Sequence, residues 1–266
     1  MHTSLNTHFI VSRHEPDNEK DLLKPAIQGM KNMLQAAYDN APQVKRIVCT
    51  SSFAAVLDAL AGYRPGHTYN EKDWNPMTYE QAIFAGPGAG YCASKACAER
   101  VAWEFVKAKK PKFDLVMINP VLVFGPVEHS VTDMKRLNQS SREVYQFMNG
   151  THDICDPALT TFPIFCDVRD VAEAHLRGYE TPGAGGQRLI ICSGNFYFEE
   201  VCGILSKVPG LEGRTTKVPD GWKRPSAYRV DTSHTEKVLG MKFMSLEKSI
   251  VDTANSLLRL EKELGC

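Results

Sequence analysis

Apolar runs and helical patterns alternate along the middle of the chain. The run Lys45-Arg46-Ile47-Val48-Cys49-Thr50 is rich in β-branched residues and predicts a buried strand. From Ala93 to Val106, apolar residues recur at helical spacing, which predicts a helix that opens at Tyr91. Residues 113–118 form a second buried strand. Strand, helix and strand in this order predict an α/β fold with a parallel, Rossmann-like doubly wound sheet and a crossover helix.

The flanking segments extend this pattern. Residues 21–34 carry apolar positions at helical spacing, and Pro25 fits the first turn of such a helix. Residues 162–166 lead into a predicted helix capped near Asp167. Further predicted elements are a strand at 187–192 and an amphipathic helix at 246–264. Residues 57–90, rich in Gly, Pro and Asn, predict a long connection over the strand ends.

Composition narrows the class of protein. With 266 residues and 43% hydrophobic content, the chain predicts a single domain over 1–266. The net charge of +0 argues against nucleic-acid and membrane partners and favours a small neutral molecule. No apolar stretch approaches eighteen residues, and the 8 Cys are scattered, so we expect a soluble, cytoplasmic protein with reduced thiols.

Tyr91 and Lys95 are the strongest candidates for chemistry. Residues four positions apart lie on one face of a helix, so both side chains can reach the same small volume. A cationic Lys would lower the pKa of the phenol and make Tyr91 a proton donor near neutral pH. The pair Ser51-Ser52 ends the first predicted strand, where a hydroxyl could hold a substrate carbonyl against the Tyr. Tyr-x-x-x-Lys alone is a weak motif, and the flanking strands give it weight.

Other chemically capable residues favour structural interpretations. The 8 His show no ligand spacing, so no metal site is expected. Asp167, Arg169 and Asp170 predict a helix cap with a salt-bridge network. Cys92 follows Tyr91 without a paired His nearby, which favours packing over nucleophilic chemistry.

Taken together, five segments resemble one family. They are Thr50-Ser51-Ser52-Phe53-Ala54-Ala55-Val56, Asn70-Glu71 with Trp74-Asn75-Pro76, Tyr91-Cys92-Ala93-Ser94-Lys95, Asn119-Pro120-Val121 with Val123-Phe124-Gly125-Pro126, and Asp167-Val168-Arg169-Asp170-Val171-Ala172. The chain resembles the extended short-chain dehydrogenase/reductases of the NAD-dependent epimerase/dehydratase superfamily, and in particular the dihydroflavonol-reductase-like fungal branch that reduces ketones and aldehydes. The segments occur in the family's order over most of the chain.

This resemblance implies roles for named residues. Tyr91 would be the acid, Lys95 its partner and the holder of the nicotinamide ribose, and Ser52 the hydroxyl that polarises the carbonyl. Ser51 competes with Ser52 for that last role.

The resemblance also implies NADPH as the cofactor. The backbone at Pro120 and Val121 would touch the nicotinamide, and Ser4 with Thr3 could line its ribose. The segment that would distinguish NADPH from NADH in the family has no counterpart in this sequence.

One family feature is missing. The family begins with a strand and a Gly-x-x-Gly-x-x-Gly turn that cradles the cofactor pyrophosphate. Neither the glycines of residues 86–90 nor those of residues 183–186 follow a predicted strand. By resemblance, the chain is expected to be N-terminally truncated and to lack the first strands of the sheet, with a substrate lobe mainly from 127–165 and 193–266.

Three functions follow as hypotheses. The first is NADPH-dependent reduction of a ketone or aldehyde to an alcohol, with family habit suggesting secondary-metabolite biosynthesis and Trp74, Tyr79, Phe84 and Tyr145 suggesting an apolar carbonyl substrate. The second is a cofactor-deficient, non-catalytic remnant that acts as a binding or scaffold protein, since an exposed sheet edge invites pairing, for example as a homodimer. The third is an epimerase or dehydratase, which uses the same acid and cofactor.

Overall fold

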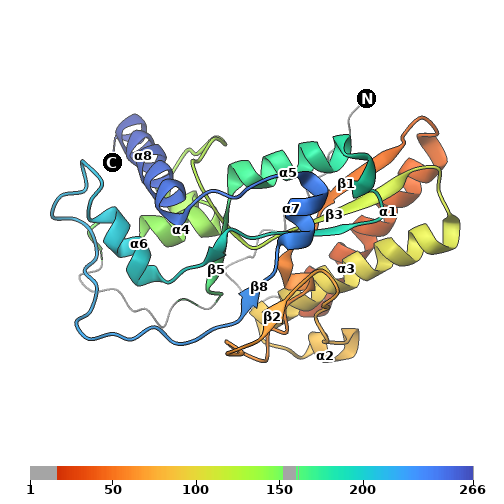
Figure 1. The fold of residues 1–266 in the computed structure, drawn as a ribbon, viewed down its shortest axis with the longest axis horizontal. Coiled ribbons are helices and arrows are strands. Elements are labelled where there is room, and N and C mark those ends of the chain that lie inside the picture. Colours follow the sequence, from red (N-terminus) through yellow and green to blue (C-terminus); the bar gives the residue numbers. More distant parts are fainter. Residues whose placement is uncertain (1–16, 152–159, 161, 266) are drawn as a thin grey trace.

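A short parallel sheet forms the centre of the molecule (Figure 1). The structure is a computed structural model and describes residues 17–151, 160 and 162–265. The sheet has the order β1-β3-β6, with β1 (Arg46–Thr50), β3 (Asp114–Pro120) and β6 (Arg188–Ile191). Both strand pairs are parallel. The predicted strands are confirmed, and β3 continues two residues further than the sequence pattern indicated.

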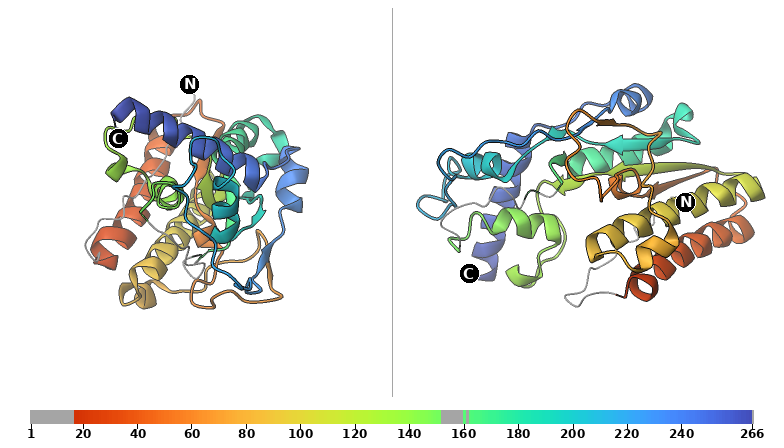
Figure 2. Two further views of the ribbon diagram at one scale, coloured as in Figure 1. Left: turned by 90° about the vertical axis from the view of Figure 1, so that its left-hand side faces the viewer. Right: turned by 90° about the horizontal axis from the view of Figure 1, so that it is seen from below.

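Helices cover both faces of this sheet, as expected for a doubly wound α/β fold. On one face, α1 (Lys24–Asn40) and α3 (Pro87–Lys109) lie side by side and bury a cluster with β1 and β3 (Figure 2). On the other face, α5 (Val168–Glu180) and α7 (Ser233–Leu239) pack against the opposite side chains of the same strands. Successive residues of a strand point to opposite faces, so a continuous apolar run supplies both clusters.

Strand β1 lies at the edge of the sheet. Within the described part of the chain it pairs with β3 alone.

Helix α3 begins earlier than its apolar pattern predicted. Gly86 is its N-cap, and Pro87 lies in the first turn. The N–H groups of the first turn have no partner within the helix, so the missing N–H of Pro87 costs no hydrogen bond. A Cβ on Gly90 would lie 2.6 Å from the side chain of Asn18, so this position requires a glycine. The glycine cluster therefore serves a helix start and its contact with the short π-helix Asn18–Leu23, which precedes α1.

A second group of elements surrounds an aromatic cluster at the other end of the molecule (Figure 1). Its strands are β4 (Leu122–Phe124), β5 (Ile164–Asp167) and β7 (Gly194–Asn195), in the order β4-β5-β7 with β7 antiparallel. Its helices are α4 (Gln139–Tyr145), α6 (Phe198–Leu205) and α8 (Leu246–Leu264). Helix α8 has the bounds predicted for the last amphipathic helix. The lobe predicted from 127–165 and 193–266 overlaps this group, although α7 packs against the central sheet instead.

The connection over residues 57–90 is more structured than its composition suggested. It contains β2 (Thr68–Tyr69), which pairs in parallel with β8 (Arg229–Val230), and α2 (Tyr79–Ile83), which begins with a capping box at Thr78. Three short 3-10 helices complete the described elements: Phe53–Ala55, Met134–Arg136 and Pro182–Ala184.

The start of α5 confirms the predicted cap and salt-bridge network. The fully buried carboxylate of Asp167 accepts the backbone N–H of Arg169 at 2.8 Å, its guanidinium at 2.8 Å and the Ser249 hydroxyl at 2.6 Å. Burial alone would raise the pKa of Asp167, but the hydrogen bonds from Arg169 and Ser249 outweigh it and lower that pKa. Asp167 thereby ties α5 to α8.

We predict that Asp167→Asn lowers the free energy of unfolding by about 2 kcal/mol at pH 7, because it removes a charged acceptor of three hydrogen bonds. The pKa of Asp167 is lower in the folded protein than in the unfolded chain. The stabilisation by its carboxylate is therefore complete above the unfolded-state pKa and is lost as the pH falls through the folded-state pKa. Urea unfolding at several pH values measures this. Asp231→Asn is the matched control, because the exposed carboxylate of Asp231 accepts a backbone N–H. We expect a smaller loss of stability in this variant. Equal stability of Asp167→Asn and wild type at pH 7 would contradict the role.

Candidate active site

Helix α3 brings Tyr91 and Lys95 together on one stripe. The ammonium of Lys95 lies 5.7 Å from the centre of the Tyr91 ring. Lys95 is buried and Tyr91 is half-buried. The predicted juxtaposition is confirmed.

Ser52 faces the same stripe from the end of β1. It is the N-cap of the 3-10 helix that follows, and its hydroxyl accepts the backbone N–H of Ala54 at 3.1 Å. The Ser52 hydroxyl is also close enough to Tyr91 for their interaction to lower the pKa of the Tyr91 phenol. The two hydroxyls therefore lie in one small volume with the Lys95 ammonium nearby.

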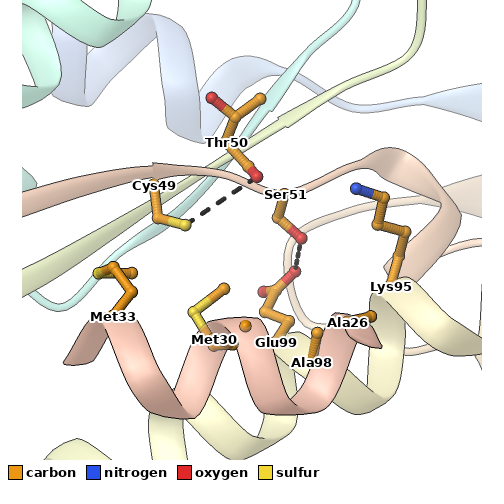
Figure 3. A pocket seen from close by; sticks show the side chains of 10 residues that line it. Ala26, Met30, Met33, Cys49, Thr50, Ser51, Lys95, Ala98 and Glu99 are labelled. Atoms are coloured by element: carbon orange, nitrogen blue, oxygen red, sulfur yellow. Dashed lines mark hydrogen bonds between the residues drawn. The ribbon is translucent and has the colours of Figure 1, made fainter. Parts of the chain in front are cut away.

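Ser51 has a different partner on the same helix. Its hydroxyl donates to the buried carboxylate of Glu99 at 2.5 Å (Figure 3). Its backbone N–H donates to the carbonyl of Ile118 at 2.7 Å. The neighbouring serines thus reach two different residues of α3.

The end of β3 lies next to this turn. Pro120 is the last residue of β3, and Val121 donates its backbone N–H to Ile191 at 3.3 Å. The side-chain amide of Asn119 donates to the Ser52 carbonyl at 3.0 Å, which joins the two strand ends. Pro120 and Val121 therefore lie, like Ser52, at the carboxyl ends of the parallel strands. Ser4 lies outside the described residues.

The electrostatics differ from the sequence prediction in one respect. Burial raises the pKa of Tyr91, the neighbouring Cys92 adds to this, and the hydrogen bond from Ser52 opposes it. Burial also lowers the pKa of Lys95. The prediction that Lys95 lowers the phenol pKa is therefore wrong for this arrangement, because loss of water around both groups dominates. A buried Tyr91 keeps its proton at neutral pH, which is the form that a proton donor requires.

A pocket of about 170 Å³ opens beside these residues (Figure 3). It lies between α1, α3 and the end of β1, with an apolar wall from α1 and polar groups from Ser51, Lys95 and Glu99. The pocket therefore lies next to the carboxyl end of β1. Ligands of α/β sheets bind at the carboxyl ends of the strands.

The residues present fit the reacting end of a nicotinamide cofactor. A phenol, an ammonium and a serine hydroxyl converge there, and the buried Oδ1 of Asn119 has no hydrogen-bond donor within the described part. The described residues include no glycine-rich turn between a strand and a helix that could cradle a pyrophosphate. Gly86, Gly88 and Gly90 belong to the start of α3, and residues 183–186 precede β6.

The four aromatic residues expected to form a substrate wall do not meet. Phe84 is 89% exposed. Tyr79 donates to Glu19 at 3.1 Å, and Tyr145 packs against the aromatic cluster. Trp74 contacts two guanidinium groups, 3.7 Å and 4.5 Å from its ring centre, which belong to Arg188 and Arg100.

Sequence reasoning missed Glu99. This carboxylate is fully buried under Ser51 and is paired with Arg188. The signal was present, since Tyr91, Lys95 and Glu99 recur every four residues and so lie on one helical stripe.

Two features are absent from residues 17–151, 160 and 162–265. No cluster of three or more His, Cys, Asp or Glu residues with metal-binding geometry occurs among them. Of the helices in those ranges, none combines the length and the apolar character needed to cross a membrane.

Comparison with known proteins places these features in a family. Residues 11–192 match the model of the NAD dependent epimerase/dehydratase family. The chain belongs to this family. The chain is 38% identical to the NADPH-dependent methylglyoxal reductase of Saccharomyces cerevisiae, over 92% of this chain and 73% of that protein. It is also 38% identical to a ketoreductase of Aspergillus niger, over 97% of this chain and 74% of that protein.

Solved structures agree with this assignment. The yeast methylglyoxal/isovaleraldehyde reductase, solved in complex with NADPH, superposes with a TM-score of 0.84 at 35% identity and covers 97% of this chain and 76% of its own. Vestitone reductase from alfalfa, at 20% identity and a TM-score of 0.67, shares the fold. The chain therefore falls in the fungal methylglyoxal and ketoreductase branch of the family.

Thiol reactivity tests the packing interpretation of Cys92. Burial raises the pKa of Cys92 and of Cys49 to about 11, whereas Cys97 is only half-buried. We predict that iodoacetamide at pH 8 labels Cys97 well before Cys92 or Cys49, because the thiolate is the reacting form. Peptide mass spectrometry over time measures this, with Cys97→Ser as the control. Fast labelling of Cys92 would instead indicate an activated thiol beside Tyr91.

Proposed function

We propose that the protein reduces a small ketone or aldehyde to an alcohol with NADPH. The observation that carries the proposal is the convergence of Tyr91, Lys95 and Ser52 at the carboxyl end of β1. The named activities of its relatives, among them methylglyoxal reduction and ketone reduction, support the same chemistry.

Each residue would have one task. Tyr91, protonated at neutral pH, would donate its proton to the carbonyl oxygen of the substrate. Ser52 would hold that oxygen by a hydrogen bond, because its side chain is close enough to Tyr91 to influence the pKa of the phenol. Lys95 would hold the ribose hydroxyls of the cofactor. Pro120 and Val121 would supply backbone contacts to the nicotinamide ring. Bound NADPH supplies the hydride.

The family also includes epimerases and dehydratases. The choice of a reductase over these two classes rests on the relatives of this chain. Four relatives at 38% identity are named as reductases or oxidoreductases. This favours net reduction of a carbonyl group over the epimerase and dehydratase reactions, in which a hydride is removed from the substrate and then returned to it.

A non-catalytic binding protein is the alternative from a different class. It is favoured by the open edge of β1 and by the lack of a glycine-rich phosphate turn in the described residues. A saturable rise in NADPH fluorescence on titration with the 266-residue chain is the result that we expect from the reductase. Absence of saturable binding by the purified chain would favour the binding protein.

We predict that Tyr91→Phe lowers kcat for methylglyoxal reduction by about 10³-fold, because the proton donor is lost. The affinity for NADPH should change less than about threefold, since the ring and Lys95 remain. Absorbance of NADPH at saturating substrate gives kcat, and calorimetry gives the affinity. Retained turnover would show that another group donates the proton.

The two serines provide a second test. Ser52→Ala should lower kcat by about 10²-fold through loss of the hydrogen bond to the carbonyl oxygen. Ser51→Ala should instead lower stability, because it leaves the buried Glu99 carboxylate with one donor fewer. Steady-state kinetics and thermal unfolding of both variants distinguish the roles. A larger kcat loss in Ser51→Ala than in Ser52→Ala would reverse the assignment.

A further inference from the structure

A buried carboxylate lies directly beneath the proposed site. Glu99 has an exposed fraction of 0%, and it accepts hydrogen bonds from four side chains. The donors are the Ser51 hydroxyl at 2.5 Å, the Asn119 amide at 2.8 Å, the Arg188 guanidinium at 2.5 Å and the Trp103 indole at 3.3 Å.

Two of these bonds reach the Ser52 turn. Ser51 is the adjacent residue, and Asn119 uses the same amide nitrogen to donate to Glu99 and to the Ser52 carbonyl. Glu99 therefore holds the side chain of Ser51, and Asn119, which also donates to Glu99, holds the carbonyl of Ser52. These two contacts fix the backbone turn that carries the Ser52 hydroxyl, whose interaction lowers the pKa of Tyr91.

A third bond connects Glu99 to the loop that follows β2. The Nη1 of Arg188 donates to the carbonyls of Glu71 and Asp73, each at 2.7 Å, and the guanidinium stacks on the Trp74 ring at 3.7 Å. The side chain of Arg188 is 9% exposed, so the whole pair is removed from water. Such a pair gains little net stability over an apolar replacement, whereas its fixed geometry can specify one conformation.

We propose that Glu99 is a positioning residue, which fixes Ser52 against Tyr91 through Ser51 and Asn119 and couples this turn to residues 70–75 through Arg188. Glu99 touches no reacting atom in this proposal. The inference rests on the proposed reductase function for its kinetic consequence, while the positioning itself is independent of turnover.

The test compares Glu99→Gln with a matched variant. Glutamine keeps the size of the side chain, but its amide cannot accept from all of the donors that surround Glu99, so one contact to Ser51, Asn119 or Arg188 must be lost. Glu261→Gln is the control, because Glu261 is also buried and pairs with Arg214 in the distant aromatic lobe. Both variants remove a buried charge, and only one lies near Ser52.

Hydrogen exchange measured by mass spectrometry tests the positioning without turnover. We expect at least a tenfold faster exchange in peptides covering 51–57 and 70–76 for Glu99→Gln, and no change there for Glu261→Gln. Unchanged exchange in both peptides would overturn the proposal, whether or not the protein reduces a carbonyl.

Kinetics test the consequence for Ser52. In the wild-type background, Glu99→Gln should lower kcat by at least tenfold with KM for NADPH changed by less than threefold. In the Ser52→Ala background the same substitution should change kcat by less than threefold, because the positioned hydroxyl is already absent. Equal effects in both backgrounds would show that Glu99 does not act through Ser52. Wild type without turnover would count against the proposed function alone, since the exchange result would still decide the positioning.

Discussion

The parallel pairing of β1 with β3 is the constraint on which the site depends. Five consecutive residue pairs keep these strands in register, from Arg46 with Asp114 to Thr50 with Ile118. This register brings the Ser51-Ser52 turn beside Asn119 and Pro120, and the crossover helix α3 must then lie against both strands. Tyr91 and Lys95 are carried to the serine turn by this geometry. The arrangement of these residues is therefore a consequence of backbone pairing and helix packing rather than of any single side-chain contact.

Burial sets the protonation of the site. Loss of water raises the pKa of Tyr91 and lowers that of Lys95, so both shifts favour the neutral form of each group. A neutral phenol is ready to donate, and a partly desolvated ammonium would interact strongly with a bound polar group. The carboxylate of Glu99, by contrast, is compensated by Arg188 and three neutral donors.

Much of this arrangement could be predicted from the sequence. The apolar runs gave β1, β3 and β6, and the four-residue spacing gave the shared face of Tyr91 and Lys95. The start of α3 could not be predicted from apolar periodicity, because its first turn consists of Gly86 to Gly90 and is held by a contact with Asn18. The different partners of Ser51 and Ser52 could not be predicted either, since they depend on how the chain turns after β1.

Long-range polar pairs were the part that sequence patterns concealed. Arg188 and Glu99 are separated by 89 positions, and the interpretation of Trp74 as a substrate wall failed because two guanidiniums occupy its surroundings. The electrostatic prediction failed for a related reason. Charge proximity can be inferred from helical spacing, whereas the extent of desolvation depends on the surrounding packing.

Isotope transfer tests the central claim most directly. The chain would be incubated with a ketone or aldehyde and NADPH that carries deuterium at its transferable position, and the alcohol product would be analysed by mass spectrometry. The account predicts an alcohol with one deuterium on the former carbonyl carbon, formed by wild type and lost in Tyr91→Phe. An alcohol without deuterium, or no alcohol despite saturable NADPH binding, would contradict it.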